Sequence, residues 1–339
     1  RALELAAKGL RITSPNPMVG AVIVRDGEIV GEGYHKLYGG DHAEVEAFRS
    51  LKDPTLAVGA TLYVTLEPCC HFGKTPPCCD EVIKRGVKRV VCSNQDPNPI
   101  VAGKGFDKLR ASGIEVTLGI CEEQGREVNK RFFTRHNLAR PYVILKWAQT
   151  SDGFIARSDG SSKWISCEES RRLVHSWRAE EDSIMVGTNT VVCDNPELTV
   201  RAVNGLNPKR VILDRNLRLA ESYKVLSDGN PTVLITAQKD SHIRAKSVEI
   251  VAIEPYELTY ILRYLANRGI NSIFVEGGAQ VIRSFIEDDL WDEARIFSAD
   301  KVSFGSGISA PIIKRSHNLQ EKKERSGDDS LSTIFNRSI

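Results

Sequence analysis

Residues 61–79 read TLYVTLEPCCHFGKTPPCC, and this stretch decides how the first half of the chain folds and what it binds. Its first six residues form a mostly apolar run, which predicts a strand buried on both faces. Two adjacent cysteine pairs follow, Cys69-Cys70 and Cys78-Cys79. A disulfide scaffold would be smaller and denser in cysteine, and the N-terminus shows no export signal. We therefore interpret the cluster as a metal site in a reducing cytoplasm.

The sequence around this stretch alternates strand and helix signals. We expect strands at 19–24, 61–66, near 89–92 and at 115–118, and helices near 43–51, 78–84 and 105–111. Asp26-Gly27 predicts a hairpin turn after the first strand. This pattern is typical of an α/β fold in which helices sandwich the sheet.

The length of 339 residues favours two domains. Residues 121–140 are rich in charge and predict a helix that leads into a linker before Pro141. We place a first domain at 1–140 and a second at 141–339. The second repeats the α/β pattern, with strands expected at 142–147, 183–186, 210–213, 232–235, 272–275 and 294–297 and helices at 168–179, 258–267 and 279–287. The tail after about Ser316 is polar and carries little signal.

Composition excludes several classes of function. The chain is 41% hydrophobic and 27% charged with a net charge of +2, so bulk electrostatics do not indicate a polyanionic partner. No apolar run approaches the ~18 residues that a membrane span requires.

One set of motifs in the first half predicts a catalytic metal site. His42-Ala43-Glu44 precedes Pro68-Cys69, and a zinc deaminase needs one imidazole, two thiolates and an open position for a water molecule. The metal lowers the pKa of that water towards ~7. Glu44 lies two residues after His42, at the start of an expected helix. His42 can therefore reach the metal while Glu44, the predicted proton shuttle, reaches the water.

Each cysteine pair offers two ligands, so four combinations are open. We choose Cys69 because it follows Pro68 where a strand ends. We choose Cys78 because it begins a helix, whose N-terminus stabilises a thiolate; Cys79 then fits the buried face. The alternatives are a closed four-ligand zinc site, which would need no His-x-Glu, and cysteines that are simply buried.

Longer motifs resemble those of a known family. PNPMVGAVIV, HAE, TLEPCCHFGKTPPC and DPNPIVAGKG in the first half, and LKWAQTSDGFIA, SSKWIS, MVGTNTVVCDNPELTVR and VEGGAQV in the second, resemble the bifunctional riboflavin-biosynthesis deaminase–reductases. The resemblance extends to about Pro311. It implies a cytidine-deaminase-like three-layer α/β/α domain followed by a dihydrofolate-reductase-like α/β domain.

The resemblance implies two reactions. The first is zinc-dependent hydrolytic removal of the 2-amino group of 2,5-diamino-6-(5-phosphoribosylamino)pyrimidin-4-one. The second is NADPH-dependent reduction of the product's ribosyl group to ribityl. The family's zinc ligands fall on His42, Cys69 and Cys78 and its proton shuttle on Glu44. Its substrate contacts fall on Asn16, His71, Lys74 and Thr75, although His71 could equally be another ligand or a loop cap.

The residues of the second half alone indicate its cofactor site less clearly than those of the first half indicate the metal site. Gly305–Ala310 matches the letters of a dinucleotide-binding fingerprint, but Pro311 follows and no helix is expected there. Residues 275–279, VEGGA, are the better phosphate site because two glycines join a strand to a helix, although an ordinary turn would look the same. The resemblance implies NADPH contacts at Ala148, Trp164, Thr190, Asp194, Gly278, Ala279, Gln280, Val281, Ile282, Arg283 and Ser284.

The resemblance also implies substrate contacts in the second half, at Lys146, Asp152, Ser162, Leu198, Arg201 and Glu276. Arg201 suits a ribose-phosphate clamp, although a surface ion pair is the alternative. Trp164 could equally belong to the core.

Two rival functions remain open. The second half could be a degenerate domain that only binds ligand or stabilises an oligomer, but Asp194, Arg201 and Glu276 argue against decay. A nucleic-acid base deaminase should show a basic, aromatic-lined groove, which the near-neutral charge disfavours. We expect phosphoribosylaminopyrimidine substrates, zinc and NADPH as cofactors, no nucleic-acid or membrane partner, a homo-oligomer and a cytoplasmic location.

Overall fold

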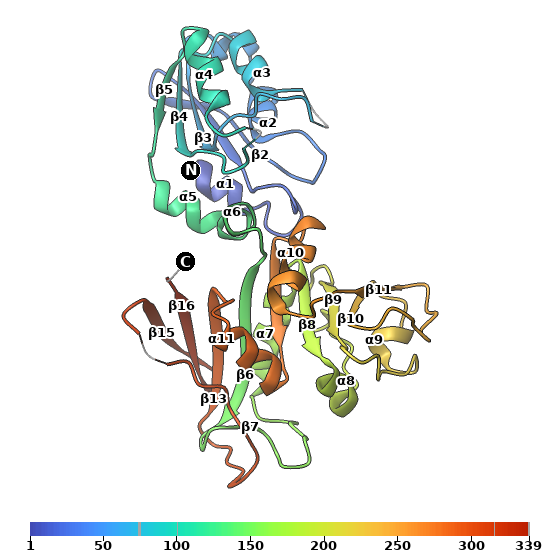
Figure 1. The fold of residues 1–339 in the computed structure, drawn as a ribbon. Helices are drawn as coiled ribbons and strands as arrows, with labels where there is room; N and C mark the ends of the chain where they lie inside the picture. The colour runs from blue at the N-terminus through green and yellow to red at the C-terminus, as the bar shows by residue number, and fades with distance from the viewer. Residues whose placement is uncertain (74–75, 100, 315, 338–339) are drawn as a thin grey trace. The chain divides into compact units, whose positions relative to one another are not determined.

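The computed structural model describes residues 1–73, 76–99, 101–314 and 316–337, which form two compact units, Arg1–Ala139 and Arg140–Ile339 (Figure 1). Each unit has its own sheet and its own core. No helix in the described ranges is long and apolar enough to cross a membrane. The α/β class expected from the sequence is confirmed.

The sheet of the first unit has the order β2-β1-β3-β4-β5. Strand β1 is antiparallel to β2 and β3, whereas β3, β4 and β5 are parallel. Asp26 and Gly27 have φ values of 52° and 84° and connect β1 to β2, as the Asp-Gly signal predicted. The strands are β1 (Gly20–Arg25), β2 (Glu28–Tyr34), β3 (Thr61–Leu66), β4 (Arg89–Asn94) and β5 (Glu115–Leu118).

Helices cover both faces of this sheet. One core packs α2 (Ala43–Arg49), α3 (Cys78–Lys84) and α4 (Lys104–Ala111) against the sheet. A Cβ on Gly33 of β2 would lie 2.3 Å from the backbone nitrogen of Ala47, so only glycine allows α2 to approach this closely. On the other face lie α1 (Ala2–Ala7) and α5 (Glu122–Val128), followed by α6 (Lys130–Leu138). A 3₁₀ turn, η1 (Pro54–Ala57), precedes β3.

The sheet of the second unit has the order β11-β10-β9-β8-β12-β6-β13-β16-β15. Strands from β11 to β13 in this order are parallel, and β16 and β15 add an antiparallel edge. A small separate ladder pairs β7 (Phe154–Ala156) with β14 (Ile308–Ser309). The main strands are β6 (Tyr142–Thr150), β8 (Ser183–Gly187), β9 (Lys209–Leu213), β10 (Thr232–Thr236), β11 (Val248–Ala252), β12 (Ser272–Glu276), β13 (Glu293–Ala299), β15 (Leu319–Ser326) and β16 (Asp329–Asn336).

Alternating residues of β6 face different helices, because successive side chains of a strand point to opposite faces. Val143 and Leu145 pack against α10 (Leu258–Asn267) and α11 (Ala279–Glu287), whereas Tyr142 and Ile144 pack against α7 (Glu168–Glu180). The short helices α8 (Thr188–Asp194) and α9 (Lys224–Ser227) pack in a further cluster on β8–β10. The parallel strands end at one edge of the sheet, where α/β proteins place ligands.

Candidate active sites

Three side chains converge between α2, β3 and α3. His42 immediately precedes α2, Cys69 follows β3, and Cys78 begins α3. His42 Nδ1 lies 3.1 Å from Cys78 Sγ and 3.5 Å from Cys69 Sγ, and the three ligand atoms all lie within 4.8 Å of one another. A tetrahedral zinc ion bonded at about 2.0 Å to nitrogen and 2.3 Å to sulfur separates these atoms by about 3.5 Å. The donor set therefore fits zinc.

The remaining cysteines of the cluster lie elsewhere. Cys79 is buried in the core and its thiol donates to the Pro68 carbonyl at 3.2 Å; burial raises the pKa of this thiol. Cys70 packs against the same core. By contrast, the backbone nitrogen of Cys78 donates to Cys69 Sγ at 3.3 Å, and the hydrogen bond from the Cys78 thiol lowers the pKa of Cys69 to about 4. Thiolate character is thus concentrated at Cys69, whereas the hydrogen bond to Cys69 and burial raise the pKa of Cys78, which donates as a thiol.

Glu44 occupies the first turn of α2 beside this cluster. It is only 3% exposed, and its carboxylate is within hydrogen-bonding reach of the Cys78 thiol. Burial raises the pKa of the carboxyl, and the nearby His42 ring opposes part of that shift. A carboxyl group with a raised pKa can both accept and release a proton near neutral pH.

Asn16 is linked to the cluster through His35, and His71 follows the Cys69-Cys70 pair in the sequence, whereas Lys74 and Thr75 lie outside the described residues. Asn16 Nδ2 is 3.3 Å from Nε2 of His35, whose ring is edge-on to His42 with centroids 5.5 Å apart. His71 Nδ1 is buried and has no hydrogen-bond partner among the described residues. His35 was not predicted from the sequence; its position directly after β2, seven residues before His42, indicates a role only once the fold brings its ring against His42.

Glu67 was also missed, although it directly precedes Pro68-Cys69. Its buried carboxylate accepts hydrogen bonds from the backbone nitrogens of Gly103 and Gly105, both at 2.9 Å, and from that of Asp96 at 3.3 Å. These bonds tie the Cys69 turn to the loop that contains Asp96. Burial raises the pKa of Asp96 to about 6.

A cavity of about 1360 Å³ lies in the second unit, at the carboxyl ends of its parallel strands. This volume exceeds the ~300–1,000 Å³ of ordinary small-molecule pockets, so it suits a dinucleotide together with a second ligand. Every NADPH contact expected from the resemblance lines it. The expected substrate contacts that line it are Lys146, Ser162, Leu198, Arg201 and Glu276.

Asp152 is the expected substrate contact that does not line the cavity. Its carboxylate accepts hydrogen bonds from the Thr150 hydroxyl at 2.5 Å, the Ser303 hydroxyl at 2.7 Å and the Gly305 backbone nitrogen at 2.7 Å. These bonds lower the pKa of the carboxyl. The contacts favour a structural role for Asp152, which joins the turn after β6 to the loop after β13.

The glycine pair between β12 and α11 forms one wall of the cavity. Gly277 and Gly278 have φ values of 102° and 75°, which other residues rarely adopt, and a Cβ on Gly278 would lie 3.3 Å from Thr190 Oγ1. The first residues of α11 also line the cavity, so their free N–H groups are available to an anionic ligand. Trp164 is 65% exposed and stacks with Arg171, 4.7 Å from the ring centroid, so it does not belong to the core.

A buried charge cluster forms the floor near β12. Glu276 accepts two hydrogen bonds from Arg178 of α7, at 2.5 Å and 2.9 Å, and pairs in register with Lys146 of β6. Burial would raise the pKa of Glu276, but Arg178 outweighs it and holds the pKa below its usual value. Burial lowers the pKa of Lys146. Two cations around one carboxylate leave a positive site that suits an anionic ligand.

Arg178 and His175 also line the cavity and were missed from the sequence. They lie three residues apart on α7, so they share a helix face. That spacing was the available signal, but which face of the helix meets the cavity depends on the fold.

Comparison with known proteins agrees with both sites. Residues 1–94 match the model of the cytidine and deoxycytidylate deaminase zinc-binding region, and residues 141–323 match that of the RibD C-terminal domain. The riboflavin biosynthesis protein RibD of Aquifex aeolicus is 45% identical, covering 99% of this chain and 96% of its own. The Escherichia coli RibD is 40% identical, covering 89% and 86%.

A solved structure has the same fold over its whole length. The diaminohydroxyphosphoribosylaminopyrimidine deaminase/5-amino-6-(5-phosphoribosylamino)uracil reductase of Thermotoga maritima superposes with a TM-score of 0.90 at 40% identity, covering 99% of this chain and 97% of its own. Acinetobacter baumannii RibD gives 0.89 at 36% identity, covering 98% and 96%. The chain therefore belongs to the RibD family of riboflavin-biosynthesis enzymes, which join a zinc-binding deaminase domain to a reductase domain.

Proposed function

We propose that the chain catalyses two successive reactions on one phosphoribosylaminopyrimidine. Residues 1–139 remove the 2-amino group of 2,5-diamino-6-(5-phosphoribosylamino)pyrimidin-4-one as ammonia, and residues 140–339 reduce the ribosyl group of the product to ribityl. The observation that carries this proposal is the His42–Cys69–Cys78 triangle with buried Glu44 beside it. The names of the similar proteins support the same pair of activities.

In the deamination, His42, Cys69 and Cys78 would hold zinc, which would supply activation of water at neutral pH. Glu44 would accept a proton from the attacking water and pass it to the departing amine, a role that its raised pKa and contact with the ligand cluster support. Asn16, His71, Lys74 and Thr75 hold the base or the phosphate. The buried Nδ1 of His71 has no hydrogen-bond partner among the described residues, which supports this role because a buried polar atom needs a partner.

In the reduction, NADPH supplies the hydride, and the protein orients both ligands. The glycine turn at Gly277-Gly278 and the start of α11 would hold the pyrophosphate of the cofactor. Glu276 and Lys146 contact the ribosyl group from the floor of the cavity. Arg201 binds the ribose phosphate; its position on the cavity wall supports this assignment.

The partners of the chain are pyrimidine ribotides. That it acts without nucleic acid, as a homo-oligomer and in the cytoplasm remains part of the proposal. The net charge of +2 supports the first point, and eight free cysteines support a reducing compartment.

Incubation with the diaminopyrimidine ribotide, with and without NADPH, tests the proposal by mass analysis of the products. We expect ammonia and the deaminated ribotide without NADPH, and a product with two further hydrogens when NADPH is present. Absence of the deaminated product would refute the first assignment. A reaction that stops at deamination despite NADPH would instead support the rival in which the second domain is degenerate.

A further inference from the structure

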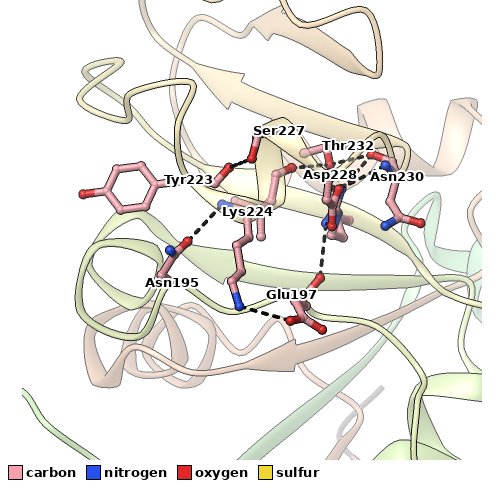
Figure 2. A network of polar contacts seen from close by, with 10 residues as sticks. Asn195, Glu197, Tyr223, Lys224, Ser227, Asp228, Asn230 and Thr232 are labelled. Carbon is pink, nitrogen blue, oxygen red and sulfur yellow. Dashed lines mark hydrogen bonds and ion pairs between the residues drawn. The ribbon is translucent and has the colours of Figure 1, made fainter.

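The loop between α8 and β9 contains Arg201, and hydrogen bonds from β9 and α9 hold this region in place. Arg210, 1% exposed on β9, donates to the Glu197 carbonyl at 3.2 Å and makes two hydrogen bonds to Asp228, at 2.8 Å and 2.7 Å. The backbone nitrogen of Lys224 donates to the Asn195 side chain at 2.9 Å (Figure 2). The backbone of Glu197 is therefore held by contacts that do not involve its carboxylate.

The Glu197 carboxylate lies between two cations that line the cavity. Figure 2 shows its contact with Lys224. The carboxylate lies 3.1 Å from Lys224 Nζ and 3.7 Å from Arg201 Nη1, and both cations line the cavity. The hydrogen bond from Lys224, followed by the charges of Lys224 and Arg201, lowers the pKa of Glu197, so this group is an anion at neutral pH. The three side chains are 42–57% exposed, and the arrangement is a chain of charges, Lys224–Glu197–Arg201, on the wall of the site.

We propose that Glu197 is an internal counter-ion of Arg201 that the substrate phosphate displaces. The inference rests on the proposed function, in which Arg201 binds the ribose phosphate. An exposed ion pair at 3.7 Å is weak, whereas a phosphate group offers a guanidinium short, charge-assisted and bidentate hydrogen bonds. Arg201 therefore exchanges one anion for the other, and Lys224 keeps the released carboxylate paired.

This arrangement sets the affinity for substrate. The Glu197 carboxylate competes with the substrate phosphate for Arg201, and it repels the phosphate once the phosphate is bound. Lys224 weakens both effects because it forms an ion pair with the Glu197 carboxylate. Glu197 and Lys224 should therefore act on substrate binding in opposite directions. A merely structural role of the same residues would weaken binding on removal of either one.

The test is the reductase KM for 5-amino-6-(5-phosphoribosylamino)uracil, measured with the full-length enzyme by NADPH oxidation. Exposed ion pairs contribute about 0.5–1 kcal/mol, so Glu197→Gln should lower this KM roughly two- to fivefold, and Lys224→Met should raise it by a similar factor. In the Glu197→Gln background, Lys224→Met should have no effect. Glu249→Gln, which removes one charge from an exposed pair with Arg268, is the matched control and should leave the KM unchanged.

Two results would overturn the proposal. One is a KM that rises or stays constant in Glu197→Gln. The other is an equal rise on Lys224→Met in both backgrounds, because Lys224 would then contact the phosphate directly. Arg201→Ala separates this inference from the proposed function. If the KM is unchanged in Arg201→Ala, Arg201 does not bind the phosphate and the proposed function is wrong on this point. If the KM rises in Arg201→Ala but does not fall in Glu197→Gln, Arg201 binds the phosphate and only the counter-ion role of Glu197 is refuted.

Discussion

Removing the carboxylate of Glu276 should destabilise the second unit strongly. The side chains of Glu276 and Arg178 are only 10% and 12% exposed, and Lys146 is partly buried beside them. Glu276→Gln keeps the shape but leaves these two cations without their anion. Breaking a buried pair in this way costs about 3–5 kcal/mol. For a unit of this size each kcal/mol lowers Tm by about 2–4 °C, so we expect a fall of roughly 6–20 °C.

Differential scanning calorimetry of the full-length enzyme measures this effect. The matched control is Glu249→Gln, since the Arg268–Glu249 pair is 49% and 40% exposed and should contribute no more than about 1 kcal/mol. Its Tm should fall by less than about 4 °C. Equal shifts in the two variants would refute the reasoning, because burial would then make no difference to the cost of the lost charge.

Three further predictions concern the first unit. Glu44→Gln should keep zinc and NADPH oxidation but slow ammonia release about 10²–10⁴-fold, and unchanged ammonia release would reject the proton-shuttle role. Cys69→Ala should lose zinc, whereas Cys79→Ala should retain it, because Cys79 lies in the core; metal analysis of both variants checks this. The free energy of unfolding of Asp96→Asn, relative to that of the wild type, should increase as pH rises. The folded-state pKa of Asp96, about 6, exceeds the unfolded value of 3.8, so its contribution is present at low pH and is lost as pH rises through 6. Two pKa units correspond to up to about 3 kcal/mol, and an equal stability difference at pH 4 and pH 7.5, measured by urea unfolding, would count against this.

Elements with a clear local sequence signal were the predictable part of the fold, even where they are largely exposed, as β5 is. Thr61–Leu66, Glu115–Leu118 and Cys78–Lys84 have the bounds that their apolar runs and helix signals indicated. The polar tail, for which the sequence predicted no element, forms the β15–β16 hairpin. Strand β15 is almost entirely exposed and mostly charged, so it has no apolar alternation to detect. Its order comes from pairing with β16, which in turn pairs with β13.

The residues of the candidate sites also divide into those that the sequence predicts and those that only the fold reveals. The zinc ligands and Glu44 could be proposed although His42 and Cys78 are 36 residues apart, because His-x-Glu and Pro-Cys are short motifs whose residue types this chemistry requires. His35, Glu67 and Arg178 could not, since each acts through a partner that only the fold brings near. Arg178 meets Glu276 across 98 residues of sequence, and Glu67 meets Gly105 across 38. The substrate contact predicted for Asp152 stays a prediction, because its motif adjoins the cavity but its hydrogen bonds join it to another loop.

X-ray absorption at the zinc edge of the purified enzyme tests the central claim most directly. We predict one zinc per chain, bound by two sulfurs, one imidazole nitrogen and one exchangeable oxygen. A zinc ion enclosed by three or four sulfurs, or a protein that retains no zinc, would contradict the deaminase assignment.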